Sequence, residues 1–209
     1  MCKNIAVLVS GGGTNLQALI DAEKRGELGN GKITCVISSK ADAYALTRAT
    51  DNGIKTRVLI RKDFSDIASY SKAMRDILLE EKADLVVYAG FMTILDKNVC
   101  DTFENKMINV HPALIPSFCG KGFYGLHVHE SALEKGVKVS GATVHFVTAE
   151  CDAGPIILQK AVEVKEGDTP ETLQKRIMQE AEWKILSKAV QLFCDGKITV
   201  ADGKTIISE

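Results

Sequence analysis

Short apolar runs alternate with amphipathic stretches along the first half of the chain, and this pattern predicts strands and helices in turn. Runs rich in β-branched residues are typical of buried strands; they lie at residues 4–9, 33–37, 56–60, 84–88 and 107–111. Helices are expected between them, at about 16–20, 43–50, 67–81 and 96–102. Such alternation predicts an α/β fold of Rossmann-like character, with a mostly parallel, twisted sheet flanked by helices.

The second half of the chain has a different pattern, in which two strands are separated only by a turn-rich segment. We expect antiparallel strands in this part of the sheet. The expected elements are a helix at about 126–135, strands at 139–147 and 156–164, a long helix that begins near Asp168, and a terminal hairpin of 197–200 and 205–207. Gln179 and Glu182 are three residues apart on the long helix. We expect them to be neighbours on one face, where they could hydrogen-bond a sugar.

Polar side chains appear abruptly where the strand at 107–111 ends. Asn109 and His111 are two residues apart, so they share one face of the strand, and Pro112 stops the strand from continuing. An amide beside an imidazole at the carboxyl end of a strand suits a reaction in which a carbonyl oxygen is polarised while a proton moves. A structural role, with both side chains satisfied by turn hydrogen bonds, explains the isolated pair equally well.

A glycine loop, Ser10-Gly11-Gly12-Gly13-Thr14-Asn15, follows the first predicted strand and leads into a helix. We expect Thr14 or Asn15 to cap this helix, whose free N–H groups and dipole favour a phosphate. A dinucleotide fingerprint does not fit, because Leu16 stands where its third glycine would be and no acid follows the second strand. A monophosphate therefore suits the loop better than NAD or ATP, and a plain tight turn is the structural alternative.

Three further segments are candidates for the same site. The turn-rich segment 148–155 holds Asp152; a carboxylate facing His111 would raise the pKa of that imidazole, although an Asx turn also explains a lone Asp. The apolar loop 89–95 leaves a strand end and could line a pocket for a flat heteroaromatic ring, or pack in the core. The loop 117–125, rich in glycine and aromatic residues, is expected to be mobile enough to act as a lid.

The composition narrows the class of protein. Of 209 residues, 45% are hydrophobic and 25% charged, which is the balance of an ordinary soluble protein. The 26 Lys and Arg residues nearly balance the 27 Asp and Glu residues, so the net charge of -1 gives no overall field that would recruit nucleic acid or a membrane surface. The N-terminal segment contains only a short apolar run, so we expect neither a signal peptide nor a membrane span, and a cytoplasmic location.

The cysteines and histidines give no metal-site pattern. The six cysteines are scattered, without a C-x-x-C pair or zinc-type spacing, and are expected to be reduced thiols. His127 and His129 are two residues apart and cannot share a helix face, so we expect no metal. A nucleophilic pair of His111 with Cys119 or Cys151 is conceivable, but no sequence feature activates a particular thiol.

Six motifs together resemble the phosphoribosylglycinamide formyltransferase family. They are S-G-G-G-T-N-L-Q, S-K-A-D-A, A-G-F-M-T-I-L, I-N-V-H-P-A-L-I-P, G-A-T-V-H-F-V and D-A-G-P-I-I. The match covers the chain from about Ile5 to the long C-terminal helix. The resemblance implies the formyltransferase fold and the transfer of a formyl group from 10-formyltetrahydrofolate to the amine of glycinamide ribonucleotide, in purine biosynthesis. The products would be formylglycinamide ribonucleotide and tetrahydrofolate.

The resemblance also implies roles for individual residues. The catalytic trio would be Asn109, His111 and Asp152. The ribonucleotide phosphate and ribose would be held by Gly12, Gly13, Thr14, Asn15, Gln179 and Glu182. The folate would contact Asn109 and the segment Met92, Thr93, Ile94 and Leu95, with the pterin bound through backbone groups.

Two alternatives predict other outcomes. A 10-formyltetrahydrofolate hydrolase or another formyltransferase of the family usually carries an added domain, for which we expect no room in this chain. A non-catalytic nucleotide-binding module would bind phosphate ligands without regard to the trio. We expect a single domain over 1–209, with a phosphate-binding half at about 1–100 and a catalytic and folate-binding half at about 101–209. Its partners are expected to be small-molecule substrates, and the protein a monomer or homodimer.

Overall fold

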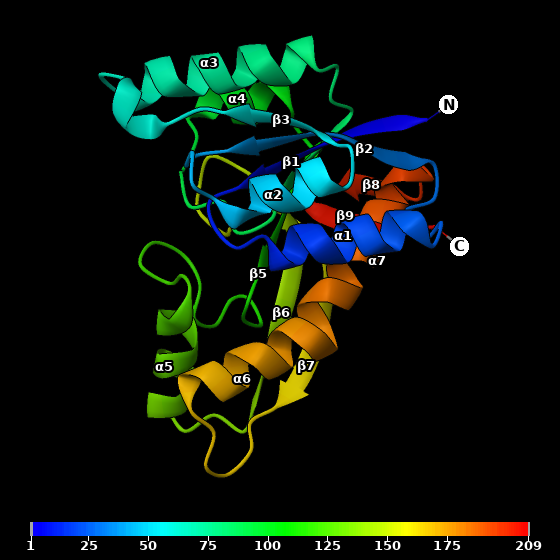
Figure 1. Ribbon diagram of the computed structural model, residues 1–209. Helices are drawn as coiled ribbons and strands as arrows, with labels where there is room; N and C mark the ends of the chain where they lie inside the picture. Colours follow the sequence, from blue (N-terminus) through cyan, green and yellow to red (C-terminus); the bar gives the residue numbers. More distant parts are fainter. Residues whose placement is uncertain (1, 209) are drawn as a thin grey trace.

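The computed structural model describes residues 2–208, and its main feature is a seven-stranded sheet of order β3-β2-β1-β4-β5-β6-β7 (Figure 1). Its strands are β1 Lys3–Val9, β2 Gly31–Ser38, β3 Lys55–Val58, β4 Leu85–Tyr88, β5 Met107–His111, β6 Val139–Phe146 and β7 Ile156–Glu163. The first five pair in parallel, whereas β6 is antiparallel to both β5 and β7. The predicted mostly parallel sheet with antiparallel strands in the C-terminal part is confirmed.

Helices connect the strands close to the predicted positions. They are α1 Thr14–Lys24, α2 Tyr44–Asp51, α3 Ile67–Glu80, α4 Lys97–Thr102, α5 Leu126–Glu134, α6 Pro170–Ile177 and α7 Trp183–Cys194, with a 3-10 turn η1 at Arg61–Asp63. The predicted terminal hairpin is present as β8 Ile198–Ala201 and β9 Lys204–Ile207. Within residues 2–208, none of the helices combines the length and apolar character needed to cross a membrane.

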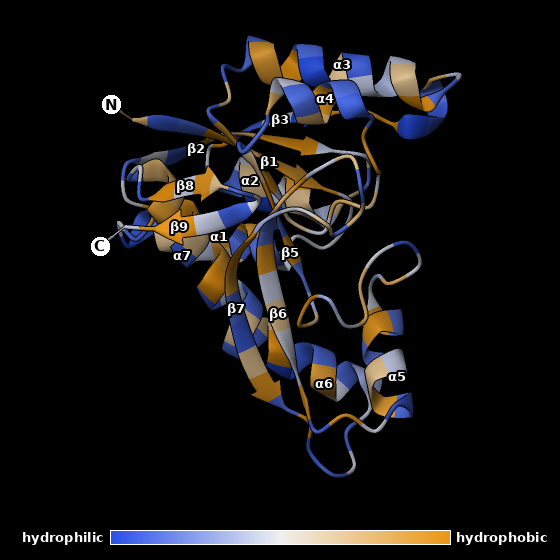
Figure 2. Ribbon diagram, turned by 180° about the vertical axis from the view of Figure 1, so that it is seen from behind, coloured by the Kyte–Doolittle hydropathy of each residue, from blue (hydrophilic) through white to orange (hydrophobic). Residues whose placement is uncertain are grey.

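Both faces of the large sheet are covered at its centre, which explains why β1, β4 and β5 are largely apolar. Side chains of β1 alternate between two cores: Val7 packs with α1, α2 and α7, and Leu8 packs with α3 and α4 on the other side. Figure 2 shows the corresponding two-sided colouring of α3 and α4, with hydrophobic and hydrophilic stripes on each helix. The centre of the sheet is therefore filled by packed side chains, which leaves the strand ends and the loops beyond them for a site.

The glycine loop differs from the prediction in one respect. The N-cap of α1 is Gly13, at φ 72°, so the predicted capping by Thr14 or Asn15 is wrong. A Cβ on Gly13 would lie 2.6 Å from the Cβ of Ala45, and the left-handed backbone independently favours glycine. Because the N-cap has no side chain, the first-turn N–H groups of α1 receive no side-chain cap from it.

The long C-terminal helix is not continuous. A π-helical turn, η2 Met178–Glu182, separates α6 from α7. Such a turn inserts an extra residue into the helical repeat, so it shifts which side chains face the sheet. Thr169 caps α6, with its hydroxyl accepting from the Thr172 N–H group.

Candidate active site

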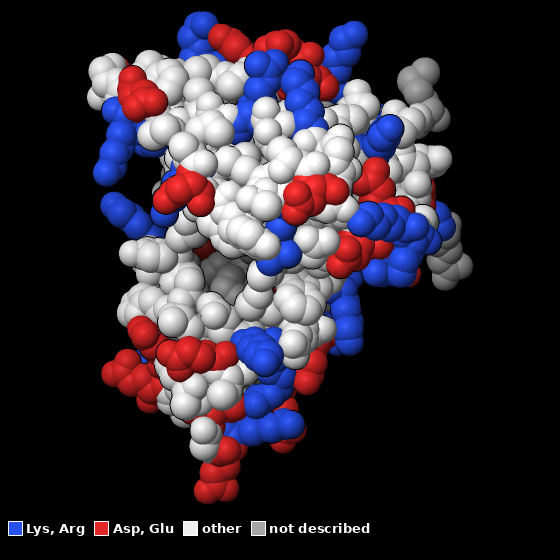
Figure 3. Space-filling model, in the orientation of Figure 1, with Lys and Arg blue, Asp and Glu red and all other residues white. Residues whose placement is uncertain are grey.

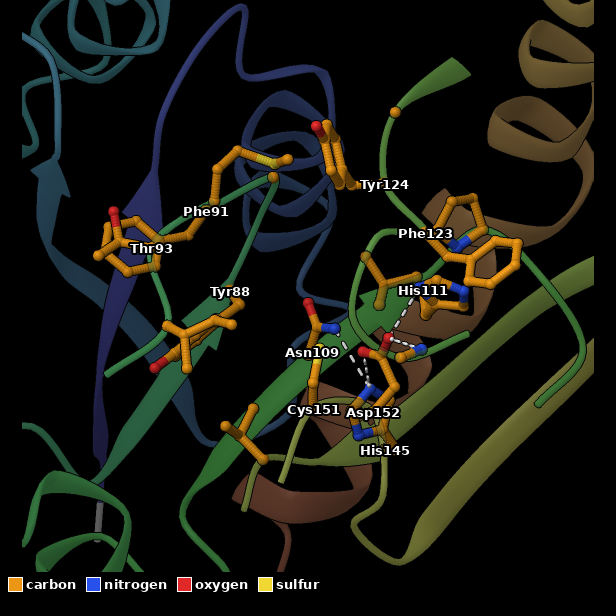
Figure 4. Close-up of a pocket in the computed structure, with 18 of the residues that line it drawn as sticks. Tyr88, Phe91, Thr93, Asn109, His111, Phe123, Tyr124, His145, Cys151 and Asp152 are labelled. Carbon is orange, nitrogen blue, oxygen red and sulfur yellow. Dashed lines mark hydrogen bonds and ion pairs between the residues drawn. The ribbon is translucent and has the colours of Figure 1, made fainter. Parts of the chain in front are cut away.

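A cleft of about 470 Å³ lies at the carboxyl ends of β4 and β5. Tyr88 of β4 is in register with Asn109 of β5, and Asn109 is in register with His145 of β6. Residues paired in this way project from the same face, so these three side chains form a row across three strands. His111, two residues beyond Asn109, projects from the same face and completes the group in Figure 4.

Three loops enclose this row. Residues 90–95 follow β4, residues 120–125 precede α5, and residues 147–152 follow β6; all three segments line the cleft. Figure 3 shows the opening as a hollow whose rim is largely uncharged. The loop 117–125, predicted as a lid, thus contributes its second half, including Phe123 and Tyr124, to the cleft wall.

Asp152 lies between two imidazoles. One carboxylate oxygen is 3.6 Å from His111 Nδ1 and the other is 3.6 Å from His145 Nε2. The backbone N–H of Gly120 donates to Asp152 Oδ2 at 2.8 Å, which ties the 117–125 loop to the site. Burial alone would raise the pKa of Asp152, but the nearby His145 and His111 side chains and the hydrogen bond from the Gly120 N–H group lower it to about 2. Asp152 is therefore a fixed negative charge near neutral pH.

His111 does not have the raised pKa that the sequence predicted. Burial lowers its pKa, and this effect outweighs the opposing influences of Asp152 and of the Phe118 carbonyl. His111 Nε2 lies 2.7 Å from the Phe118 carbonyl oxygen, which can only accept, so Nε2 carries a hydrogen and donates it. Nδ1, at 3.6 Å from Asp152, is too far for a good hydrogen bond and is available as a base in the neutral ring.

Asn109 is oriented by a residue that the sequence reasoning did not select, His145. The His145 Nδ1–H group donates to the Phe146 carbonyl at 2.8 Å, which leaves Nε2 to accept from Asn109 Nδ2 at 3.2 Å. An amide nitrogen has two hydrogens. One is held by His145, and the second remains available to an oxygen atom in the cleft. The alternation of residues 139–147 places His145 on the same side as Thr143 and allows it to line the cleft, but it gives no sign that His145 orients Asn109.

The ribonucleotide candidates are brought together only in part. Asn15 Nδ2 donates to Glu182 Oε2 at 3.0 Å, and both residues line the cleft. Burial raises the pKa of Glu182 to about 7, although the hydrogen bond from Asn15 opposes the rise. Gly12, Gly13 and Thr14 form the loop just before Asn15. Arg48 of α2, which the sequence reasoning missed, donates to the Gly12 carbonyl at 2.8 Å and places a cation beside this loop.

The prediction that Gln179 and Glu182 share one face is wrong. Gln179 is exposed, and it is absent from the described residues that line the cleft. The reason is the π-helical turn, in which residues three apart no longer share a face. Gln174, Met178 and Glu182, spaced by four, line the cleft instead.

The folate candidates Met92, Thr93, Ile94 and Leu95 all line the other end of the cleft. The Met92 N–H donates to Ser10 Oγ at 3.0 Å, which fixes the start of this segment. Leu95 is buried, whereas Met92 and Ile94 are more than half exposed and so present apolar surface at the opening. Such exposed apolar side chains at a cleft are typical of a ligand site.

Metal and thiol chemistry have no support in the described residues. Among residues 2–208 there is no group of three or more His, Cys, Asp or Glu side chains placed to hold a metal ion. Burial raises the pKa of the Cys119 thiol, and it raises that of Cys151 to about 11. Because the thiolate is the nucleophile, these shifts argue against a Cys–His pair.

Comparison with known proteins places the chain in a well-defined group. A family model described as formyl transferase matches residues 3–190. A phosphoribosylglycinamide formyltransferase from Haemophilus influenzae is 40% identical over 96% of the chain and 91% of its own length. The trifunctional purine biosynthetic protein adenosine-3 of Bos taurus is 44% identical, and the chain spans 19% of its length. A crystal structure of glycinamide ribonucleotide transformylase 1 from Symbiobacterium toebii superposes with a TM-score of 0.93 at 40% identity, covering 100% of this chain and 95% of that one.

Proposed function

The chain belongs to the formyl transferase family, and we propose that it transfers the formyl group of 10-formyltetrahydrofolate to the amine of glycinamide ribonucleotide in purine biosynthesis. The observation that carries this proposal is the convergence of Asn109, His111 and Asp152 in one cleft, which is lined at one end by Asn15, the residue after the glycine loop, and is apolar at the other. The names of the relatives agree with formylation of this ribonucleotide. The donor and the roles of individual residues are our assignments.

We assign the glycine-loop end of the cleft to the ribonucleotide. Gly12, Gly13, Thr14 and Asn15 would surround the phosphate at the start of α1, where the helix dipole and backbone N–H groups favour an anion. Asn15 Oδ1 is buried and has no hydrogen-bond partner among residues 2–208. A hydroxyl or N–H group of the sugar could satisfy this atom, with Glu182 as a second acceptor beside it.

We assign the opposite end of the cleft to the folate. Backbone groups of Met92, Thr93, Ile94 and Leu95 would contact the pterin, which is flat and apolar on both faces. This arrangement directs the formyl-bearing nitrogen toward Asn109, because Asn109 lies between that segment and Asp152 in the cleft (Figure 4). No metal is needed, since the formyl donor is already an activated acyl compound.

The proposed reaction forms a carbon–nitrogen bond before another breaks. The ribonucleotide amine attacks the formyl carbon, and the free Asn109 N–H donates to the oxygen of the tetrahedral intermediate. Neutral His111 accepts the proton that the attacking nitrogen loses, and Asp152 stabilises the resulting imidazolium. The carbon–N10 bond then breaks, and the proton from His111 is delivered to N10 of tetrahydrofolate.

A spectrophotometric assay tests this proposal directly. The purified protein is mixed with a 10-formyl folate, with and without glycinamide ribonucleotide, and formation of the deformylated folate is followed. We expect turnover that requires the ribonucleotide. Turnover without it would identify a hydrolase, and a folded protein that binds phosphate ligands without any turnover would identify a nucleotide-binding module. Either result would refute the transferase assignment.

A further inference from the structure

The apolar end of the cleft contains a polar group that the proposed reaction leaves unused, the Tyr88 hydroxyl. Within the described residues, Tyr88 Oη is buried and has no hydrogen-bond partner. The side chain is only 7% exposed, and its ring packs edge-to-face on Phe91 at a centroid distance of 5.3 Å. A buried hydroxyl without a partner destabilises a protein, so its retention calls for a function.

The surroundings of this hydroxyl distinguish it from its neighbour Tyr70. Tyr88 and Cys100 both line the cleft, whereas Tyr70 is fully buried and is absent from the described residues that line it. The Tyr70 hydroxyl likewise has no partner in residues 2–208. The two hydroxyls therefore share burial and the lack of a hydrogen-bond partner among residues 2–208, and the two residues differ in that only Tyr88 lines the cleft. This difference supplies a matched pair for experiment.

The chemistry of Tyr88 suits recognition of a neutral polar group. Burial raises the pKa of the Tyr88 hydroxyl well above its ordinary value, and the nearby Cys100 and Tyr70 add to the effect. The group therefore remains protonated, and it can both donate and accept a hydrogen bond. Cys100, whose pKa is also raised by burial, is a neutral thiol beside it. A charged ligand group would find no counter-charge here, but an amide-like edge would find a partner.

The strand register fixes where that partner would lie. Tyr88 is directly opposite Asn109 on the next strand, with adjacent strands separated by about 4.8 Å. Figure 4 shows Tyr88 on the far side of Asn109 from Asp152, beside Phe91 and Thr93. A heterocycle that places its reactive nitrogen at Asn109 therefore directs its remote edge toward Tyr88.

We propose that the Tyr88 hydroxyl is a specificity-determining group, which hydrogen-bonds the 2-amino-4-oxo edge of the pterin ring. This inference rests on the proposed function, because it presumes that a folate occupies the apolar end. The pyrimidinone edge offers an N–H donor and a carbonyl acceptor, both of which a phenol can satisfy. The unpartnered hydroxyl thus becomes satisfied only when the correct heterocycle is bound, and a ring without the polar edge leaves it unsatisfied.

The test compares Tyr88→Phe with wild type and with Tyr70→Phe as the matched control. Calorimetry measures the Kd of two non-transferring folate analogues, one with the 2-amino-4-oxo edge and one in which both groups are replaced by hydrogen. We expect Tyr88→Phe to weaken binding of the intact analogue by about three- to tenfold and to leave the edge-deleted analogue unaffected. Tyr70→Phe should change neither affinity.

Thermal unfolding of the ligand-free proteins provides a second readout. Both Tyr→Phe variants should unfold at or above the wild-type temperature, because each loses a buried hydroxyl without a partner. If the Tyr88 hydroxyl had only a structural role, Tyr88→Phe would instead lower the unfolding temperature and leave ligand discrimination unchanged.

The outcomes separate this inference from the proposed function. Equal affinity of wild type and Tyr88→Phe for the intact analogue would overturn the inference, as would an equal loss for both analogues. In either case, ribonucleotide-dependent turnover of a 10-formyl folate by the wild type would still support the transferase. A wild-type protein that neither binds nor turns over such a folate would overturn the transferase first, and the inference with it.

Discussion

The middle of the cleft and its two ends differ in whether buried polar groups have hydrogen-bond partners. In the middle, Asn109, His111, His145 and Asp152 each make at least one hydrogen bond within the protein. At the ends, Asn15 Oδ1 and Tyr88 Oη are buried without a partner among the described residues. The groups to which we assign catalysis are thus held in place by the protein itself, whereas the flanking groups are available to the ligands that we propose.

This difference follows from what each region must do. Groups that stabilise a transition state are most effective when they are already oriented, because no reorganisation is then required during the reaction. Groups that select a ligand are most discriminating when an incorrect ligand leaves them unpaired. Mutations in the middle should therefore affect the rate of the chemical step, and mutations at the ends should affect binding.

The largest effect is expected for His111→Ala. Loss of an oriented catalytic group typically lowers kcat by about two to three decades, and the KM values of both substrates should change little. Steady-state kinetics with each substrate varied in turn measures both quantities, and circular dichroism checks that the variant is folded. Wild-type turnover in a folded His111→Ala protein would remove His111 from the catalytic trio.

Asp152→Asn should have a smaller effect on kcat, of about one to two decades, and a diagnostic effect on the pH profile. The negative charge of Asp152 raises the pKa of His111 against the larger lowering by burial. Its removal lowers the His111 pKa further, so His111 stays a neutral base at lower pH, and the acid limb of kcat should move to lower pH. An unchanged limb, or a shift to higher pH, would contradict the proposed pairing.

At the ribonucleotide end, Glu182→Gln should affect binding rather than kcat. The pKa of Glu182 is about 7, so the carboxylate that accepts from a sugar hydroxyl is lost as the pH falls below 7. The wild-type KM for the ribonucleotide should rise in that range, whereas the KM of Glu182→Gln should be about three- to tenfold higher at pH 8 and independent of pH.

Glu180→Gln is the matched control for this experiment, because Glu180 is an exposed acid on the same π-helical turn. Its KM should follow the wild-type pH dependence. If Glu182→Gln retained that dependence as well, another group would have to be responsible for it.

The smallest effect on activity is expected for His129→Leu. This variant tests whether an unpartnered polar group that does not line the cleft affects stability alone. His129 is fully buried on α5, and neither ring nitrogen has a partner in residues 2–208. Burial and, to a smaller extent, the nearby His111 lower its pKa to about 4, so the unfolded chain binds a proton between about pH 6.5 and pH 4 and the folded protein does not. The free energy of unfolding should therefore fall by about 1–3 kcal/mol as the pH decreases through that range.

Denaturant unfolding at several pH values, with His129→Leu for comparison, measures this contribution. The variant should lose most of that pH dependence and keep wild-type kinetics. A large loss of kcat at neutral pH in stably folded His129→Leu would show that the distinction between cleft and non-cleft groups is too simple.

The sequence pattern predicts the fold correctly, and it also places the candidates of the trio near one another, for physical reasons. Alternating patterns determine strand faces, so Asn109 and His111 could be assigned to one face before any coordinates. The turn-rich segment 148–155 holds two carboxylates, Glu150 and Asp152, and the resemblance to the formyltransferase family is what singles out Asp152. Burial requires apolar side chains at regular intervals along a helix or strand, so these positions can be recognised in the sequence.

Other site residues left no such signal. Gln179 was predicted wrongly because a π-helical turn breaks the 3.6-residue repeat. The pKa of His111 depends on whether the lowering by burial exceeds the raising by Asp152, and only the three-dimensional structure shows which is larger. Tyr88, at the end of a buried strand, has the pattern of an ordinary core residue, and only the missing hydrogen-bond partner distinguishes it.

The row of Tyr88, Asn109 and His145 across adjacent strands has a consequence for redesign. Because hydrogen-bonded strands keep a constant spacing, the backbone separation between Tyr88 and Asn109 is set by the sheet itself, and with it the span available to the heterocycle that we propose. Insertions or deletions in the surrounding loops leave this dimension unchanged. A variant that accepts a longer or shorter one-carbon donor would therefore require a change of residue size within β4 or β5, and loop grafting alone should fail.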